Sequence, residues 1–167
     1  MSFTNGVSQA LHEEHQATIA LMERLEQFIA RHRRDGTPDA GDTAAARLLS
    51  DLATSMENEV QRHFAFEEER LFTYLNTIGN EAIGAHLTDE HAVLRPIGAR
   101  LARLAREAAA TGFDASKWVE FHQTGQELCE TLRAHVQKEE MALLPLIEES
   151  MDAETEAQFL KEYRETT

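Results

Sequence analysis

Two stretches of this chain share one pattern: His-Phe-Ala-Phe-Glu-Glu at 63–68 and His-Val-Gln-Lys-Glu-Glu at 135–140. In both, the first glutamate follows the histidine by four residues, and on an α-helix two such positions lie only about 40° apart. The imidazole and the carboxylate therefore share a helix face, where they make a good pair of metal ligands. The pattern predicts that both stretches are helical and that they belong to a two-metal site in a helical bundle.

An acid-Glu-His triplet lies upstream of each pattern, as Glu13-Glu14-His15 in the first half and Asp89-Glu90-His91 in the second. The two halves can be aligned on these residues, and the identities concentrate at the candidate ligands. Two helix pairs related by an approximate two-fold axis would bring four histidines and two glutamates to a common centre. The predicted metal ligands are His15, His63, Glu67, His91, His135 and Glu139.

The other four histidines, which have no counterpart in the opposite half, are His12, His32, His86 and His122. His32 stands among arginines at a helix end, so we expect an exposed cation that interacts favourably with the helix dipole. His122 is expected to be a surface or packing residue. His12 lies one turn from His15, and we favour a packing role for it over a place beside the metal site.

His86 and the second glutamate of each pattern are less well aligned with the site. His86 precedes His91 by five residues, about 140° around a helix, so only a π-bulge would bring it to the metal. We therefore expect it not to be a ligand. Glu68 and Glu140 point roughly 100° away from the first glutamates. We expect these two acids to lie beside the site or at the surface.

Turn-forming residues divide the rest of the chain into long segments rich in good helix formers. The predicted turns are Asp35–Asp42, Asn76–Asn80 and Thr111–Asp114, and the predicted helices are 5–34, 43–75, 80–110, 115–149 and 153–165, the last capped by Asp152. Short loops make successive helices antiparallel. The prediction is an all-α, up-down-up-down four-helix bundle with a short fifth helix at the C-terminal end. Leu21, Leu25 and Phe28 have the spacing of a buried stripe. Pro96 and Pro145 should each bend a helix or mark a boundary.

The bulk properties favour one domain over residues 1–167 and exclude several kinds of partner. A net charge of −14 argues against binding to nucleic acid or to an anionic membrane. The lone cysteine, Cys129, excludes an internal disulfide and a thiolate metal site, and it is expected to be a packing residue. Neither a secretory signal nor an apolar run of about 18 residues is visible, so we expect a cytoplasmic protein.

The candidate ligands offer nitrogen and oxygen but no sulfur. Such a set suits iron or manganese better than calcium, which takes oxygen ligands, and zinc remains an alternative. Ferritin-like di-iron proteins use Glu-x-x-His, in which the acid stands three residues before the histidine. None of the eight histidines here has a glutamate at that position, which disfavours that family.

These motifs resemble those of the hemerythrin-like, or HHE cation-binding, family across nearly the whole chain. The resemblance is carried by Glu14-His15, His63-Phe64-x-x-Glu67-Glu68-x-x-Leu71-Phe72, Glu90-His91 and His135-x-x-x-Glu139-Glu140-x-x-Leu143-Leu144-Pro145. It implies a four-helix bundle that holds two iron ions (Fe²⁺/Fe³⁺) with an oxo or hydroxo bridge. By position, His15 and His63 would bind one iron, and His91 and His135 the other. The bridging carboxylates would be Glu67 and Glu139.

The sequence departs from the oxygen-carrying hemerythrins at one ligand. Those proteins have a fifth histidine four residues before the third-helix histidine, where this chain has Leu87, and an aspartate five residues after the fourth-helix histidine, where this chain has Glu139 at four. The four-His, two-Glu set is similar to that of bacterial di-iron proteins implicated in the repair of iron–sulfur clusters. Those proteins usually have an additional N-terminal, cysteine-bearing domain, which we do not expect here.

The resemblance favours a protein that binds or senses a small oxidant, namely dioxygen, peroxide or nitric oxide. Two alternatives stay open from the sequence: a di-iron enzyme that removes peroxide or nitric oxide, and a protein that stores or donates iron. Catalytic residues are not assigned. A sensor would need to signal through another protein chain, since we expect no fused partner domain.

Overall fold

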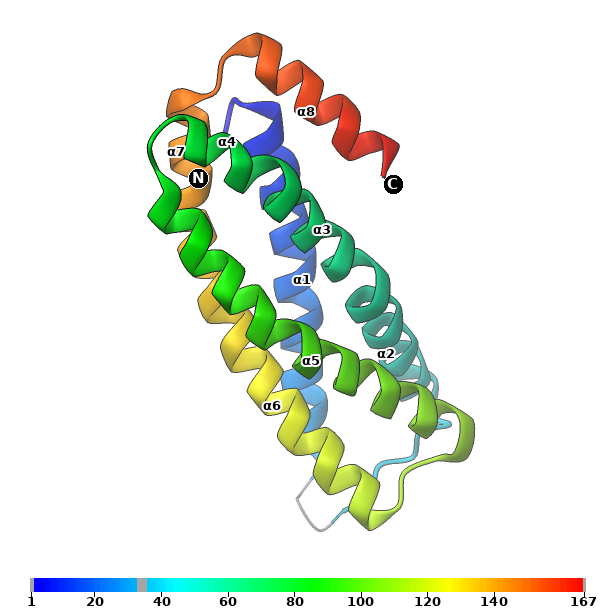
Figure 1. Ribbon diagram of the computed structural model, residues 1–167. Helices are drawn as coiled ribbons and strands as arrows, with labels where there is room; N and C mark the ends of the chain where they lie inside the picture. Colours follow the sequence, from blue (N-terminus) through cyan, green and yellow to red (C-terminus); the bar gives the residue numbers. More distant parts are fainter. Residues whose placement is uncertain (1, 33–35, 167) are drawn as a thin grey trace.

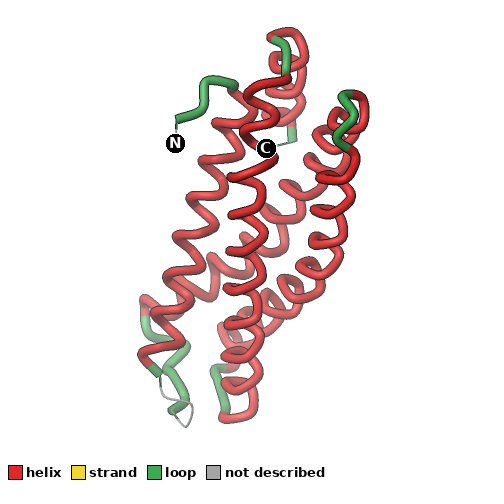
Figure 2. Tube along the Cα trace, turned by 90° about the vertical axis from the view of Figure 1, so that its left-hand side faces the viewer, coloured by secondary structure: helices red, strands yellow, loops and turns green. Residues whose placement is uncertain are grey.

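A computed structural model describes residues 2–32 and 36–166, which form helices joined by short loops, with no strand among them (Figure 2). Successive long helical segments run in opposite directions, and a short helix folds back over one end (Figure 1). The all-α, up-down-up-down bundle with a fifth helix is thus confirmed. The helices are α1 (Gly6–Arg31), α2 (Thr43–Thr54), α3 (Val60–Phe66), α4 (Phe72–Thr77), α5 (Glu81–Thr111), α6 (Ala115–Lys138), α7 (Leu144–Ser150) and α8 (Ala153–Glu165).

Three π-helical turns link some of these helices into longer segments. They are η1 (Ser55–Glu59), η2 (Glu67–Leu71) and η3 (Glu139–Leu143). Helices α2, α3 and α4 thereby form one segment, and α6 and α7 form another. A π-turn holds one more residue than an α-helical turn, and such turns are frequent at functional sites. Two of the three begin at the first glutamate of a His-x-x-x-Glu-Glu pattern, so the repeat extends to the backbone.

The helix ends follow the predicted turn chemistry. Asp152 caps α8 by accepting a hydrogen bond from the Thr155 backbone N–H at 2.8 Å, as predicted. Gly79 and Gly112 have φ of 81° and 79° in the two later turns, a conformation that favours glycine. Residues 33–34 of the first predicted helix and Asp35 of the first predicted turn lie outside the described residues.

The two prolines differ in their effect. Pro145 is the second residue of α7, directly after η3, and marks the boundary that its missing backbone donor predicts. Helix α5 continues through Pro96 without a boundary. The bend predicted at that position stays a prediction.

The core consists of two apolar clusters with the candidate ligands between them. The larger cluster includes the predicted stripe of Leu21, Leu25 and Phe28 and extends toward the α5–α6 loop. The smaller cluster lies at the other end of the bundle and includes Leu11 and Leu71. The site is therefore closed above and below by packed side chains.

Cys129 is buried and unpaired, with Sγ 3.8 Å from the sulfur of Met22. Burial raises the pKa of its thiol to about 12, so the predicted packing role is confirmed.

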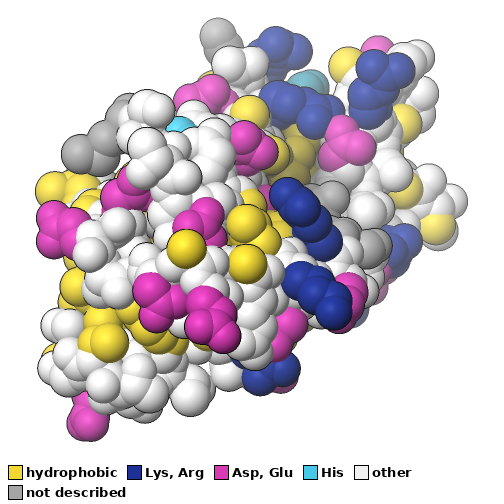
Figure 3. Space-filling model, turned by 90° about the horizontal axis from the view of Figure 1, so that it is seen from above, with side chains coloured by type: hydrophobic (Ala, Val, Ile, Leu, Met, Phe, Trp, Pro, Cys, Tyr) yellow, Lys and Arg dark blue, Asp and Glu magenta, His cyan; other side chains and the backbone are white. Residues whose placement is uncertain are grey.

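Charged residues are distributed over the surface. Acidic and basic side chains lie interspersed on the end of the molecule shown in Figure 3. Elsewhere Arg24 pairs with Asp51 at 2.8 Å, and Arg133 with Glu26 at 2.7 Å. No described helix has the length and apolar composition needed to cross a membrane.

Candidate metal centre

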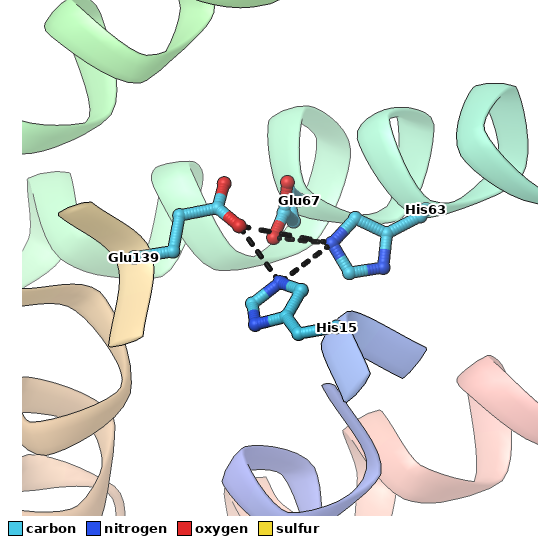
Figure 4. A group of neighbouring side chains, drawn as sticks. All are labelled: His15, His63, Glu67 and Glu139. Atoms are coloured by element: carbon cyan, nitrogen blue, oxygen red, sulfur yellow. Dashed lines mark hydrogen bonds and ion pairs between the residues drawn. The ribbon is translucent and has the colours of Figure 1, made fainter. Parts of the chain in front are cut away.

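All six candidate ligands converge in the middle of the bundle, and all six are buried. Figure 4 shows four of them: the side chains of His63 and Glu67, from one helical segment, point toward His15 and Glu139, which come from other segments. They come from α1 (His15), α3 (His63), the start of η2 (Glu67), α5 (His91), α6 (His135) and the start of η3 (Glu139).

The four imidazoles form two pairs. Nε2 of His15 lies 3.3 Å from Nε2 of His63, and Nε2 of His91 lies 3.1 Å from Nε2 of His135. Each pair joins one residue from an upstream triplet to one from a His-x-x-x-Glu-Glu pattern in the same half. The internal repeat of the sequence is thus an approximate symmetry of the site.

Each buried glutamate lies between the two histidine pairs. Oε2 of Glu139 is 2.8 Å from Nε2 of His15, and its Oε1 is 2.8 Å from Nε2 of His135. Oε1 of Glu67 is 2.9 Å from Nε2 of His63, and its Oε2 is 3.2 Å from Nε2 of His91. Both carboxylates therefore present one oxygen to each pair, which is the arrangement of a bridging ligand.

Two four-residue groups have ligand atoms that all lie within 4.8 Å of one another. They are His15, His63, Glu67 and Glu139, and Glu67, His91, His135 and Glu139. The groups share both glutamates. Each group could hold a metal ion, and the two groups lie side by side.

A ring of four further glutamates fixes the orientation of the imidazoles. The Nδ1–H groups of His15 and His63 donate to Glu140 and Glu14, each at 2.6 Å. In the other pair, Nδ1–H of His91 donates to Glu68 and that of His135 to Glu90, each at 2.8 Å. Because Nδ1 carries the hydrogen that faces outward, the Nε2 lone pair faces the centre.

Cations hold the outer carboxylates in turn. Arg62 donates to Glu14 at 2.7 Å, and Arg95 donates to Glu68 at 2.9 Å. Lys138 pairs with Glu90. These charged neighbours and the histidines overcome the effect of burial, and the pKa values of the outer glutamates lie below their ordinary value. The ring stays ionised, so it can accept the imidazole hydrogens.

Glu68 and Glu140 lie beside the ligands, as the sequence predicted, whereas the expectation for His12 was wrong. Nδ1 of His12 is 2.8 Å from Oε2 of Glu140, so His12 contacts the same carboxylate as His15. The one-turn separation places His12 in the outer ring, although it does not reach the centre.

The atoms that face the centre fit a cation. All four oxygens of Glu67 and Glu139 are buried, and the polar atoms close to them are imidazole Nε2 atoms, which can donate to them only when protonated. Buried carboxylates without donors are costly. Four Nε2 lone pairs and four carboxylate oxygens are all acceptors, and divalent metal ions are what such a nitrogen and oxygen set binds.

The buried carboxylates also favour protonated imidazoles when no metal is bound. Burial lowers the pKa of His15, but Glu139 and Glu140 outweigh it and raise that pKa to about 8. For His91, Glu139, Glu67 and Glu68 outweigh burial and raise the pKa to about 9. Protons and metal ions therefore compete for the same nitrogen atoms.

The remaining histidines lie away from the centre. The His86 side chain is 60% exposed with Nε2 3.3 Å from Glu90, so it is not among the clustered residues, as expected. His122 packs edge-on against Trp118, also as expected. His32 corrects the prediction of an exposed cation: it is half-buried, and its Nδ1–H donates to the Phe28 carbonyl at 2.8 Å. Trp118 packs against its ring and covers it.

A family model described as the hemerythrin HHE cation binding domain matches residues 6–147, and a second, overlapping match covers 85–166. The chain belongs to this family, and we conclude that it is a metal-binding protein. Searches among curated proteins and among solved structures found no significant match.

Replacing an outer carboxylate should weaken metal binding without removing a ligand. We expect Glu68→Ala to lower the metal affinity by about tenfold to a hundredfold, because His91 loses the acceptor that fixes its orientation. The measurement is competition with a coloured chelator. Glu69→Ala is the matched control, since Glu69 is exposed on the same turn. Equal affinities for the two variants would contradict a role for Glu68.

Metal loading should release protons in a pH-dependent manner. A pH of 7 lies below the pKa values of His15 and His91, which are about 8 and about 9. Both imidazoles therefore carry a proton that the metal must displace. We expect ferrous iron to release about two or more protons per chain in weakly buffered solution at pH 7. The release should decline as the pH rises through 8 to 9. A release that stays constant up to pH 10 would contradict this assignment.

Proposed function

We propose that this chain is a non-haem di-iron protein that binds or senses a small oxidant such as dioxygen, peroxide or nitric oxide. The proposal is carried by one observation: two groups of four buried ligand atoms share both carboxylates. We take residues 1–167 as a single domain, because the two overlapping family matches fit one bundle built from two similar halves.

In this proposal, His15 and His63 hold one iron, and His91 and His135 hold the other. Glu67 and Glu139 bridge the pair. Two imidazoles and two carboxylate oxygens give each iron four protein ligands, which leaves room for a further ligand. When bound, the iron pair supplies electron exchange with the oxidant. The chain's own residues orient the ligands, keep the outer imidazole nitrogens protonated and limit access of water.

Apolar side chains restrict that access. Leu11, Leu87 and Leu94 lie one turn from the upstream histidines and are at most 2% exposed, whereas Ile19 is partly buried. A dry shell of this kind controls solvent access and the redox behaviour of a metal site. It is expected to slow uncontrolled oxidation of ferrous iron.

Burial favours retention of the metal over donation of iron. No candidate ligand is more than 7% exposed, and each imidazole is held by a second carboxylate. Release of iron would require these imidazoles to leave the carboxylates that hold them. A di-iron enzyme that removes peroxide or nitric oxide is the second candidate, because the same open position that binds an oxidant can convert it.

Metal analysis and an optical spectrum of protein purified from iron-rich medium test the di-iron centre. We expect about two iron ions per chain and absorption from a bridged ferric pair. His91→Ala should empty at least one position. His86→Ala, the matched control from the same helix, should leave both filled.

A content of one metal per chain, or of zinc alone without such absorption, would contradict the di-iron centre. Loss of iron from His86→Ala equal to the loss from His91→Ala would contradict the ligand assignment.

Rapid mixing of the ferrous protein with oxygen distinguishes the functions. We expect a spectral change that reverses when oxygen is removed, since the buried site protects the bound state from water. Sustained consumption of added peroxide or nitric oxide would support the enzyme instead. Rapid transfer of iron to a metal-free acceptor protein would support donation and contradict the proposal.

A further inference from the structure

A pocket of about 210 Å³ adjoins the site beside His15 and His63. It is lined from α1, α3, α6 and the start of η3, with mainly apolar side chains along its walls. The buried side chains at its inner end are His15, His63, His135 and Glu139. The wall residues are Ala17, Thr18, Val60, Phe64, Leu132 and Val136. His91, the upstream histidine of the other half, is not among the lining residues.

The repeat explains why the pocket adjoins only one upstream histidine. Aligning the halves on their histidine patterns places Val136 opposite Phe64. The Phe64 ring stacks on His91 with centroids 3.8 Å apart and an interplanar angle of 10°. The smaller Val136 stands at the equivalent position near His15. A phenyl ring thus covers His91, whereas the pocket adjoins the equivalent histidine, His15.

A second aligned pair differs in the same direction. Thr18 corresponds to Leu94 when the halves are aligned on their upstream histidines. Leu94 is only 2% exposed and belongs to the apolar core, whereas Thr18 is half-buried and lines the pocket. At both aligned positions, the residue that lines the pocket near His15 is smaller than its counterpart, and this difference leaves space for the pocket.

The mouth of the pocket is polar. Arg62 and Glu14 line it and pair at 2.7 Å, and the Arg62 guanidinium lies 5.7 Å from the centroid of the Tyr163 ring. These two charged groups compensate each other, so the mouth carries no net charge to attract an ion. Its walls favour an apolar molecule, and its inner end favours a polar group.

The volume exceeds what a diatomic ligand needs. An engineered cavity of about 150 Å³ lined by apolar side chains holds benzene. At about 210 Å³, this pocket has space for a molecule of similar size with one further atom. A peroxide or nitric oxide molecule would leave most of that space unfilled.

We propose that this pocket binds a small neutral molecule with an apolar body of about six heavy atoms and one terminal oxygen, and that the molecule reaches the site beside His15 and not beside His91. The oxygen lies toward His15 and His63, and the apolar body packs against Val60, Leu132 and Val136. The inference deepens the proposed function, and it rests on that function only for the contact between the oxygen and a metal.

Phenol is a suitable probe, because it has this size and chemistry. Calorimetric titration of phenol into the purified, metal-loaded protein should show one site per chain. Each variant introduces the larger residue that stands at the aligned position of the other half: Val136→Phe follows Phe64, and Thr18→Leu follows Leu94. We expect each to weaken phenol binding by at least about tenfold. Val93→Phe is the matched control, because Val93 is 55% exposed and outside the pocket.

The inference would be overturned if the wild-type protein did not bind phenol, or if both pocket variants bound it as well as the wild type. Weakening by Val93→Phe equal to that by Val136→Phe would also overturn it. Thermal unfolding of every variant identifies a folding defect, and Thr18→Leu tests the pocket from a half-buried position if Val136→Phe fails to fold.

Iron content measured in the same samples keeps the two proposals separate. Two irons per chain without phenol binding leaves the di-iron function standing and removes the pocket assignment. Phenol binding that Val136→Phe weakens, in a protein that holds no iron pair, supports the pocket assignment and contradicts the di-iron function.

Discussion

The structure depends on a concentration of hydrogen-bond acceptors in its dry interior. Four imidazole nitrogens and two carboxylates face one another between two apolar clusters, and without a metal the carboxylate oxygens depend on protonated imidazoles for hydrogen bonds. Such an arrangement is unfavourable by itself, since buried acceptors that lack partners lose their hydration. Cations remove this cost. The geometry of the site thus agrees with the membership of this chain in a cation-binding family.

The outer ring makes this arrangement possible. A histidine can present its Nε2 lone pair inward only if its Nδ1–H has an acceptor on the other side, and here a glutamate fills that role for each of the four. Two of these bonds stay within a half, from His63 to Glu14 and from His135 to Glu90. The other two join the halves, so the ring ties all four long helical segments together around the centre.

The two halves are similar in their ligands and different in their surroundings. Phe64 covers His91, whereas Val136 stands at the aligned position near His15. The two candidate histidine pairs therefore have different surroundings. Because the difference lies in residues that bind no metal, access can change during evolution without a change in the ligands.

Much of the fold and of the candidate site could be predicted from local rules. Because Glu67 follows His63 by four residues, both side chains lie on the same face of a helix. The turn residues predict where most helices end. The repeat identified His15 and His91 as further candidate ligands, because they occupy equivalent positions in the two halves. These inferences need only helix geometry and an alignment of the chain with itself.

Other features could not be predicted, because they depend on which helices become neighbours. The pairing of Glu68 with His91 joins two helices, and nothing in either sequence stretch specifies that contact. His32 was expected to be exposed from its arginine neighbours, yet Trp118 from another helix covers it. The sequence by itself determined the ligand types, their helical spacing and the bundle. Only the tertiary structure decided which acids orient the imidazoles and which half has a pocket, since both follow from side chains that meet across helices.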